Sequence, residues 1–277
     1  MIPLKPIYQC PVCGEPLERD NRLWRCSNNH TFDISREGYV NLLLAHQKKS
    51  KNAGDSKMMV DCRRRFLNQG YYDPLPLAIA ANLTKLAPDV PFVLLDIGCG
   101  EGYYSNTLLQ QLPQCQMWGV DISKPAIAAA AKRYNEIEFF VASSYRLPIS
   151  DQSVDVALKI YAPVDLAEVS RVVANNGYFI SVIPGRNHLY ELKELIYDTP
   201  QHHDELEDVP EGFVSIDRIE ICKHITLDNN EHIKDLLAMT PYYWHIPESR
   251  QQSVASRLTL TCQIHFIINI YRKTPEE

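Results

Sequence analysis

The sequence predicts an α/β fold, built on a parallel sheet with helices on both faces and preceded by a small separate module. From residue 91 onward, short apolar runs end in acidic or glycine-rich turns, and helical patterns separate these runs. That alternation is typical of doubly wound sheets. In front of it, three cysteines and a histidine lie between residues 10 and 30. A chain of 277 residues has room for one large domain and one such module.

The overall composition is that of a soluble globular protein, with 45% hydrophobic and 22% charged residues. No apolar stretch approaches the roughly 18–20 residues that a membrane span needs. The first ten residues, MIPLKPIYQC, lack the apolar segment of a secretion signal. We therefore expect a cytoplasmic protein that does not contact membranes.

The charge is distributed unevenly along the chain. The net charge is −6, but residues 1–75 carry 12 Lys and Arg against 8 Asp and Glu, so the N-terminal part is basic and the remainder strongly acidic. A basic end suits an anionic partner. Ordinary surface variation explains the same numbers equally well.

The N-terminal module has the pattern of a metal site. Two residues separate Cys10 from Cys13, twelve separate Cys13 from Cys26, and three separate Cys26 from His30. Paired soft ligands at this spacing suit tetrahedral Zn²⁺, and a reducing cytoplasm disfavours disulfides. Four protein ligands leave no open position, so the zinc is structural. We expect residues 1–40 to form a zinc-binding module whose folding depends on the metal.

Residues 41–80 form a predicted basic connector with one or two helices. It contains two clusters of positive charge, and phosphate contact is their functional interpretation. A solvated helix face is at least as good an interpretation of either cluster alone. The neighbouring zinc module favours a nucleic acid. The predicted RNA-binding residues are Lys48, Lys49, Lys51, Arg63, Arg64 and Arg65.

The chemical centre of the chain follows the buried strand predicted at 91–95. The strand runs into the turn Asp-Ile-Gly-Cys-Gly-Glu-Gly, and a helical pattern over 103–112 comes next. A second predicted strand ends in Asp121, 25 residues after Asp96. A carboxylate at the end of this strand is placed to accept hydrogen bonds from ribose hydroxyls. Acids in the loop would repel a pyrophosphate but suit the cationic S-adenosylmethionine. The residues predicted to hold it are Asp96, Gly98, Gly100, Glu101 and Asp121.

Further strands are predicted at 137–141, 153–160, 177–184, 220–227 and 260–271, which completes a seven-stranded sheet. Residues 81–277 are thus predicted to be a class I (Rossmann-like) S-adenosylmethionine-dependent methyltransferase domain. Ser143 and Ser144, after the third strand, lie where the adenine ring is expected. The tip of the fourth strand carries Tyr161, Ala162 and Pro163, which we expect to line the pocket for the target base. Asp165 is a candidate general base by position only and is better explained as a helix cap.

The motifs CPVCGEPL, FDISREGYVNLL, GDSKMM, RRRFLNQGYYDPL, LLDIGCGEGYYS, IYAP and PGRNHLYELKELIY occur in order along the chain. Together they resemble the RlmA family, the bacterial 23S rRNA (guanine-N1)-methyltransferases. The resemblance implies zinc on the Cys3His set, methylation of N1 of one guanine in a domain II hairpin of 23S rRNA, and a homodimer. It also implies cofactor contacts at Tyr72, Gly100, Glu101 and His188.

Methylation at guanine N1 sets mechanistic demands. N1 carries a proton near neutral pH, so the enzyme must flip the base out, align N1 with the methyl group and allow the proton to leave. Two other functions remain open from the sequence. A small-molecule methyltransferase would share the core but has little use for a zinc module, and a zinc-dependent nucleic-acid binder with an inactive core would not need the intact acidic and glycine set.

Overall fold

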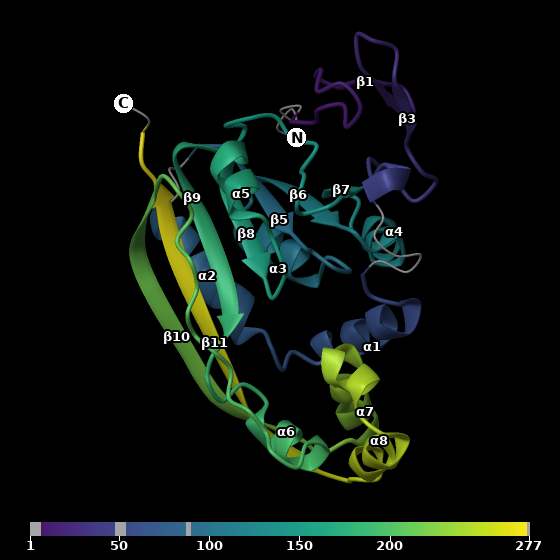
Figure 1. Cartoon of the computed structure of the whole chain (residues 1–277), viewed down its shortest axis with the longest axis vertical. Coiled ribbons are helices and arrows are strands. Elements are labelled where there is room, and N and C mark those ends of the chain that lie inside the picture. The colour runs from purple at the N-terminus through teal and green to yellow at the C-terminus, as the bar shows by residue number, and fades with distance from the viewer. Residues whose placement is uncertain (1–6, 48–53, 87–89, 276–277) are drawn as a thin grey trace.

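The computed structural model describes residues 7–47, 54–86 and 90–275. The chain forms two sheets, a small one near the N-terminus and a large one that runs through the body of the molecule (Figure 1). The small sheet is antiparallel, in the order β1-β2-β3. Its strands are β1 (Glu18–Asp20), β2 (Leu23–Arg25) and β3 (Thr31–Asp33).

The large sheet has eight strands in the order β10-β11-β9-β8-β5-β6-β7-β4. Strands β4 to β9 are parallel to one another, whereas β11 is antiparallel to both of its neighbours, β9 and β10. Strands β10 and β11 form the long curved edge in Figure 1. The seven predicted strands are all present. The eighth, β4, is two residues long, too short to carry a sequence pattern. The bounds are β4 (Val40–Asn41), β5 (Phe92–Ile97), β6 (Cys115–Asp121), β7 (Glu138–Val141), β8 (Val154–Ile160), β9 (Val173–Pro184), β10 (Phe213–Leu227) and β11 (Leu260–Lys273).

Four helices, α1, α4, α5 and α7, begin at a capping side chain. Ser56, Ser123, Asp165 and Asn229 each accept a hydrogen bond from a backbone N–H in the first turn of the following helix. Asp165 is therefore a helix cap, as predicted. In the described part of the chain, no helix combines the length and apolarity that crossing a membrane requires. The helices are α1 (Lys57–Leu67), α2 (Pro74–Leu86), α3 (Tyr103–Gln111), α4 (Lys124–Arg133), α5 (Leu166–Val172), α6 (Tyr190–Ile196), α7 (Asn230–Met239) and α8 (Glu248–Ala255), with 3-10 turns η1 (Ala45–Gln47) and η2 (Pro241–His245).

The two faces of the large sheet are covered differently. Successive residues of β5 point to opposite faces, so Leu94 packs with α2, α3 and α4 while Leu95 packs on the other side. On that second face the cover consists of α5 and the N-terminal zinc-ligand module. Leu94 and Leu95 are both fully buried. The continuous apolar run of β5 is thus explained by burial on both faces.

The N-terminal module shares its core with the large sheet. Tyr8 lies between Trp24 of β2 and Trp118 of β6, with ring centroids 4.8 Å away in both cases, and it also contacts Phe140 of β7 at 5.0 Å. All four rings are buried. One hydrophobic cluster therefore extends from the module into the large sheet, and the predicted boundary at residue 40 lies within β4.

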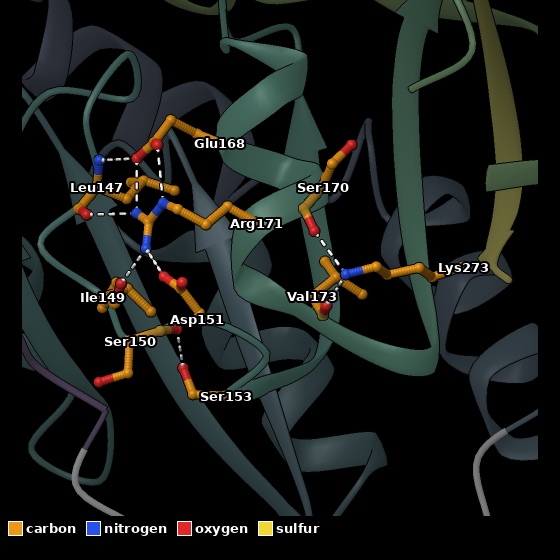
Figure 2. Close-up of polar contacts among 10 residues, drawn as sticks. All are labelled: Leu147, Ile149, Ser150, Asp151, Ser153, Glu168, Ser170, Arg171, Val173 and Lys273. Carbon is orange, nitrogen blue, oxygen red and sulfur yellow. Dashed lines mark hydrogen bonds and ion pairs between the residues drawn. The ribbon is translucent and has the colours of Figure 1, made fainter. Parts of the chain in front are cut away.

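Arg171 of α5 fixes the loop between β7 and β8 (Figure 2). Its guanidinium donates to the carbonyls of Leu147 and Ile149, at 2.9 and 2.6 Å, and to the carboxylates of Glu168 and Asp151. Glu168 in turn accepts the Leu147 N–H at 2.6 Å. Charge-assisted bonds of this kind are among the strongest in proteins, so the loop is rigidly attached to α5.

This loop joins the N-terminal module to the ligand-binding edge of the sheet. Tyr8 forms a β-bridge with Ile149, and the Ser150 N–H donates to the Ile7 carbonyl at 2.8 Å. The same loop begins at Ser143 and Ser144, which were predicted to hold the cofactor. At the far end of α5, Lys273 of β11 donates to the carbonyls of Ser170 and Val173 and so attaches the helix to the sheet (Figure 2).

Candidate active site

A cavity of about 720 Å³ opens at the carboxyl ends of the central parallel strands. This is the edge at which doubly wound sheets bind their ligands. The sequence-predicted residues that line the cavity are Tyr72, Gly98, Gly100, Glu101, Asp121, Ser143, Ser144, Tyr161, Ala162, Pro163 and His188. They come from six separate segments, and the structure brings them to one place.

The glycine-rich turn after β5 forms the floor of the cavity. Gly98, Gly100 and Gly102 all adopt positive φ, at 78°, 58° and 81°, a region that favours glycine. A Cβ atom at Gly98 would lie only 2.2 Å from the Cβ of Ala162. The turn after β8 therefore packs directly on the glycine turn, and this contact positions Tyr161, which itself has φ of 56°.

Three carboxylates of the described residues line the cavity, and two of them, Asp121 and Glu101, belong to the predicted cofactor site. Asp121, at the end of β6, accepts the Gly100 N–H at 3.0 Å and the Ser123 N–H at 2.7 Å. Glu101 is 3% exposed, and its Oε1 has no hydrogen-bond partner among the described residues. Burial raises the pKa of Glu101 to about 7, with Arg133 at 3.9 Å opposing the rise. A buried carboxylate with a vacant acceptor suits a cationic ligand.

Asp96 has a different place from the one predicted. Its carboxylate lies behind the glycine turn, 2% exposed, and accepts the Ser105 hydroxyl of α3 at 2.6 Å. Burial raises its pKa to about 7. Asp96 is not among the residues that line the cavity, and its hydrogen bond with Ser105 anchors the glycine turn on α3.

The wall opposite the acids is aromatic. The Tyr72 hydroxyl lies 3.4 Å from His188 Nε2, while His188 Nδ1 accepts the backbone N–H of His265 at 3.1 Å. Burial lowers the pKa of His188 to about 3, so the ring is neutral at physiological pH. The Tyr161 ring lies 5.6 Å from His188, and Phe266 of β11 packs beneath both. This side of the cavity is suited to a planar ring.

Two residues that were not predicted from the sequence, His203 and Tyr242, also line the cavity. His203 Nε2 lies 3.3 Å from the Tyr242 hydroxyl, and burial lowers the pKa of His203 to about 4. The segment that carries His203 is fixed across the sheet by Glu207, which contacts Lys159 Nζ and the Ser181 hydroxyl, both at 2.6 Å. No local motif marks either residue, because long-range folding alone brings them to the cavity.

The three arginines of α1 are all ion-paired within the chain. Arg64 pairs with Asp61 on the same helix at 3.0 Å. Arg65 makes a two-pronged contact with Asp235 of α7, a buried carboxylate, so its arrangement is that of a structural bond between two helices. Arg63 pairs with Asp55 and faces the cavity. Lys48, Lys49 and Lys51 lie outside the described residues.

The predicted zinc ligands converge. The Sγ atoms of Cys10, Cys13 and Cys26 and a ring nitrogen of His30 all lie within 4.8 Å of one another. His30 Nδ1 is 3.6 Å from Cys10 Sγ and 3.4 Å from Cys26 Sγ. Three thiolates and one imidazole at this mutual spacing match a tetrahedral structural zinc site.

Comparison with known proteins identifies relatives over nearly the whole chain. The zinc-ribbon family described as RlmA, N-terminal, matches residues 8–51, and the family described as Methyltransferase domain matches residues 94–177. The chain is 31% identical, over 243 residues, to the 23S rRNA (guanine(748)-N(1))-methyltransferase of Streptomyces fradiae, covering 86% of this chain and 85% of that protein. It is 31% identical over 255 residues to YxjB of Bacillus subtilis (strain 168), covering 88% and 89%, whose name gives 23S rRNA guanine-N1 methylation as an unproven assignment. Among solved structures, the YcgJ protein of Bacillus subtilis superposes with a TM-score of 0.48 at 17% identity, covering 71% of this chain and 97% of that one.

Proposed function

Because the chain belongs to the RlmA family of 23S rRNA (guanine-N1)-methyltransferases, we propose that it methylates N1 of one guanine in a domain II hairpin of 23S rRNA. The observation that carries this proposal is the cavity itself, which has an acidic floor and an aromatic wall opposite it. The acidic floor suits the cationic S-adenosylmethionine. The aromatic wall suits a nucleobase, and the zinc-ligand module shares a core with the same sheet.

The cofactor's place follows from the chemistry of the lining residues. Asp121 accepts hydrogen bonds from ribose hydroxyls, and the vacant oxygen of Glu101 accepts one from the amino group. Ser143 and Ser144 border the adenine ring, in a loop that Arg171 holds in place. Tyr72 closes the site from the N-terminal side of α2. When bound, S-adenosylmethionine supplies an electrophilic methyl group on a sulfonium.

The target guanine enters from the side of Tyr161, Ala162 and Pro163. The left-handed backbone at Tyr161 directs its ring toward His188, and a flipped base stacks on this surface. N1 must lose its proton to react, and His188 and His203 are both uncharged at neutral pH, so neither is an imidazolium acid that could return a proton to N1. These residues align the base and exclude water, so positioning supplies much of the acceleration.

The RNA backbone lies along the basic N-terminal part. The zinc module and Arg64 contact phosphates together with Lys48, Lys49 and Lys51. Arg63 lines the cavity and Arg65 is bonded to the buried carboxylate of Asp235, which narrows the six predicted RNA-binding residues to these four. We also propose that the protein works as a homodimer, as the family resemblance implies, which sedimentation of the purified protein tests.

Mass spectrometry of nucleosides tests the function directly. Unmodified 23S rRNA, free and in assembling particles, is incubated with the zinc-loaded protein and S-adenosylmethionine. New N1-methylguanine at one position supports the proposal. Methylation of a small acceptor by the full-length zinc-loaded protein, with no product on any rRNA, would assign a small-molecule methyltransferase. Absence of cofactor binding would assign a nucleic-acid binder with an inactive core.

A further inference from the structure

The charges around the cavity are unbalanced. Asp55, Glu101 and Asp121 contribute three carboxylates, and Arg63 is the only arginine or lysine among the described lining residues. S-adenosylmethionine brings two cationic groups, the sulfonium and the ammonium, and one anionic group, the α-carboxylate. The acids suit the first two groups. A carboxylate placed among these acids would be repelled unless a cation lies beside it.

Arg63 lies where that cation is required. A Cβ atom at Gly100 would be 3.6 Å from Arg63 Nη1, so the guanidinium lies directly over the glycine turn. Burial raises the pKa of both Glu101 and Asp121, and Arg63 lies close enough to both carboxyls to oppose that rise. Its side chain is 28% exposed, which leaves it partly shielded from solvent.

The guanidinium is held in place and still has donors to offer. Arg63 Nη1 pairs with Asp55, and Nη2 donates to the Met239 carbonyl at the end of α7, at 3.2 Å. A guanidinium has five N–H donors, and within the described part of the chain these two contacts leave three of them available. The two partners orient the planar group before any ligand arrives, which lowers the entropy cost of a third contact.

We propose that Arg63 binds the α-carboxylate of the methionine part of S-adenosylmethionine. The assignment rests on the proposed function, because it takes the cavity as the cofactor site. It moves Arg63 from the RNA surface to the cofactor pocket and gives α1 a direct part in cofactor selection. Through the Met239 carbonyl, the same side chain connects the cofactor to the lobe formed by α7 and η2, which carries Tyr242 to the cavity.

The test compares two ligands that differ in the carboxylate alone. Isothermal titration calorimetry measures binding of S-adenosylmethionine and of decarboxylated S-adenosylmethionine to the full-length zinc-loaded protein, without RNA. The variants are Arg63→Ala and Arg63→Lys. Arg272→Ala is the matched control, because it removes one positive charge from an exposed position on β11 outside the cavity lining. Circular dichroism and thermal unfolding verify that each variant is folded.

The wild type is expected to prefer S-adenosylmethionine over the decarboxylated form by about 10- to 100-fold, the range of a hydrogen bond between charged groups. Arg63→Ala reduces this preference to less than about threefold, Arg63→Lys gives an intermediate value, and Arg272→Ala leaves it unchanged. If the substitution only loosened the structure around Asp55 and Met239, the affinities for both ligands would fall equally. The ratio of the two affinities would then stay unchanged.

An unchanged ratio in Arg63→Ala, or no preference in the wild type, overturns the assignment while cofactor binding stands. If the folded wild type binds neither ligand, the proposed function fails as well. If only the affinity for 23S rRNA falls in Arg63→Ala, the original RNA role is restored and the carboxylate role is refuted.

Discussion

Replacing Glu101 by glutamine removes a charge that the fold buries without full compensation. The carboxyl is 3% exposed, one oxygen has no partner among the described residues, and the nearest guanidinium nitrogen, on Arg133, is 3.9 Å away. Burial raises its pKa from 4.5 to about 7. The folded protein therefore holds this proton more tightly than the unfolded chain does. The stability contributed by the protonated form is complete below pH 4.5 and is lost as pH rises through 7.

The size of the effect follows from the two pKa values. A tenfold difference in proton affinity corresponds to about 1.4 kcal/mol, so between pH 5.5 and pH 8.5 the wild type loses roughly 2 kcal/mol of unfolding free energy through this group. Glutamine does not titrate, so Glu101→Gln escapes that loss. The unfolding free energy of the variant minus that of the wild type therefore increases by roughly 2 kcal/mol from pH 5.5 to pH 8.5.

Urea unfolding at the two pH values, without cofactor and with zinc present, measures this difference. Asp96 titrates in the same window, but it is present in both proteins and cancels in the comparison. Glu136→Gln, on the surface after α4, is the control and is expected to show no such gain. An equal pH dependence in wild type and Glu101→Gln would refute the reasoning that burial of this carboxylate costs stability.

Three further predictions follow from other contacts. Cys26→Ser is expected to lose the bound zinc, measured by elemental mass spectrometry, and to lower the melting temperature of the whole chain because the module shares a core with the sheet. Gly98→Ala places a Cβ against Ala162 at positive φ, so it is expected to cost at least about 2 kcal/mol in urea unfolding and to weaken cofactor binding in calorimetry. Arg65→Ala leaves the buried carboxylate of Asp235 unpaired, and a loss of about 1–3 kcal/mol of unfolding free energy, with rRNA affinity unchanged, identifies a structural residue.

Local features of the sequence were sufficient to predict the metal site, the ligand-binding edge of the sheet and one helix cap. The spacing of Cys10, Cys13, Cys26 and His30 sets which side chains a single metal can collect, because short turns limit how far the ligands can separate. The glycine turn and the apolar strand before it predicted which edge of the sheet binds the ligand, because the carboxyl ends of parallel strands all lie at that edge. Even the cap at Asp165 followed from helix chemistry alone.

Long-range folding decided what no window of sequence contains. His203 reaches the cavity only because Glu207 fixes its segment across the sheet, and Arg65 finds Asp235 170 residues away. Arg63 and Arg64 are neighbours in one basic run, yet the helical turn between them directs one into the cavity and the other outward. The sequence by itself determined which residues are chemically suited to bind metal and cofactor. Only the tertiary structure decided which of them meet, because the partners of a buried charge are chosen by packing between distant segments.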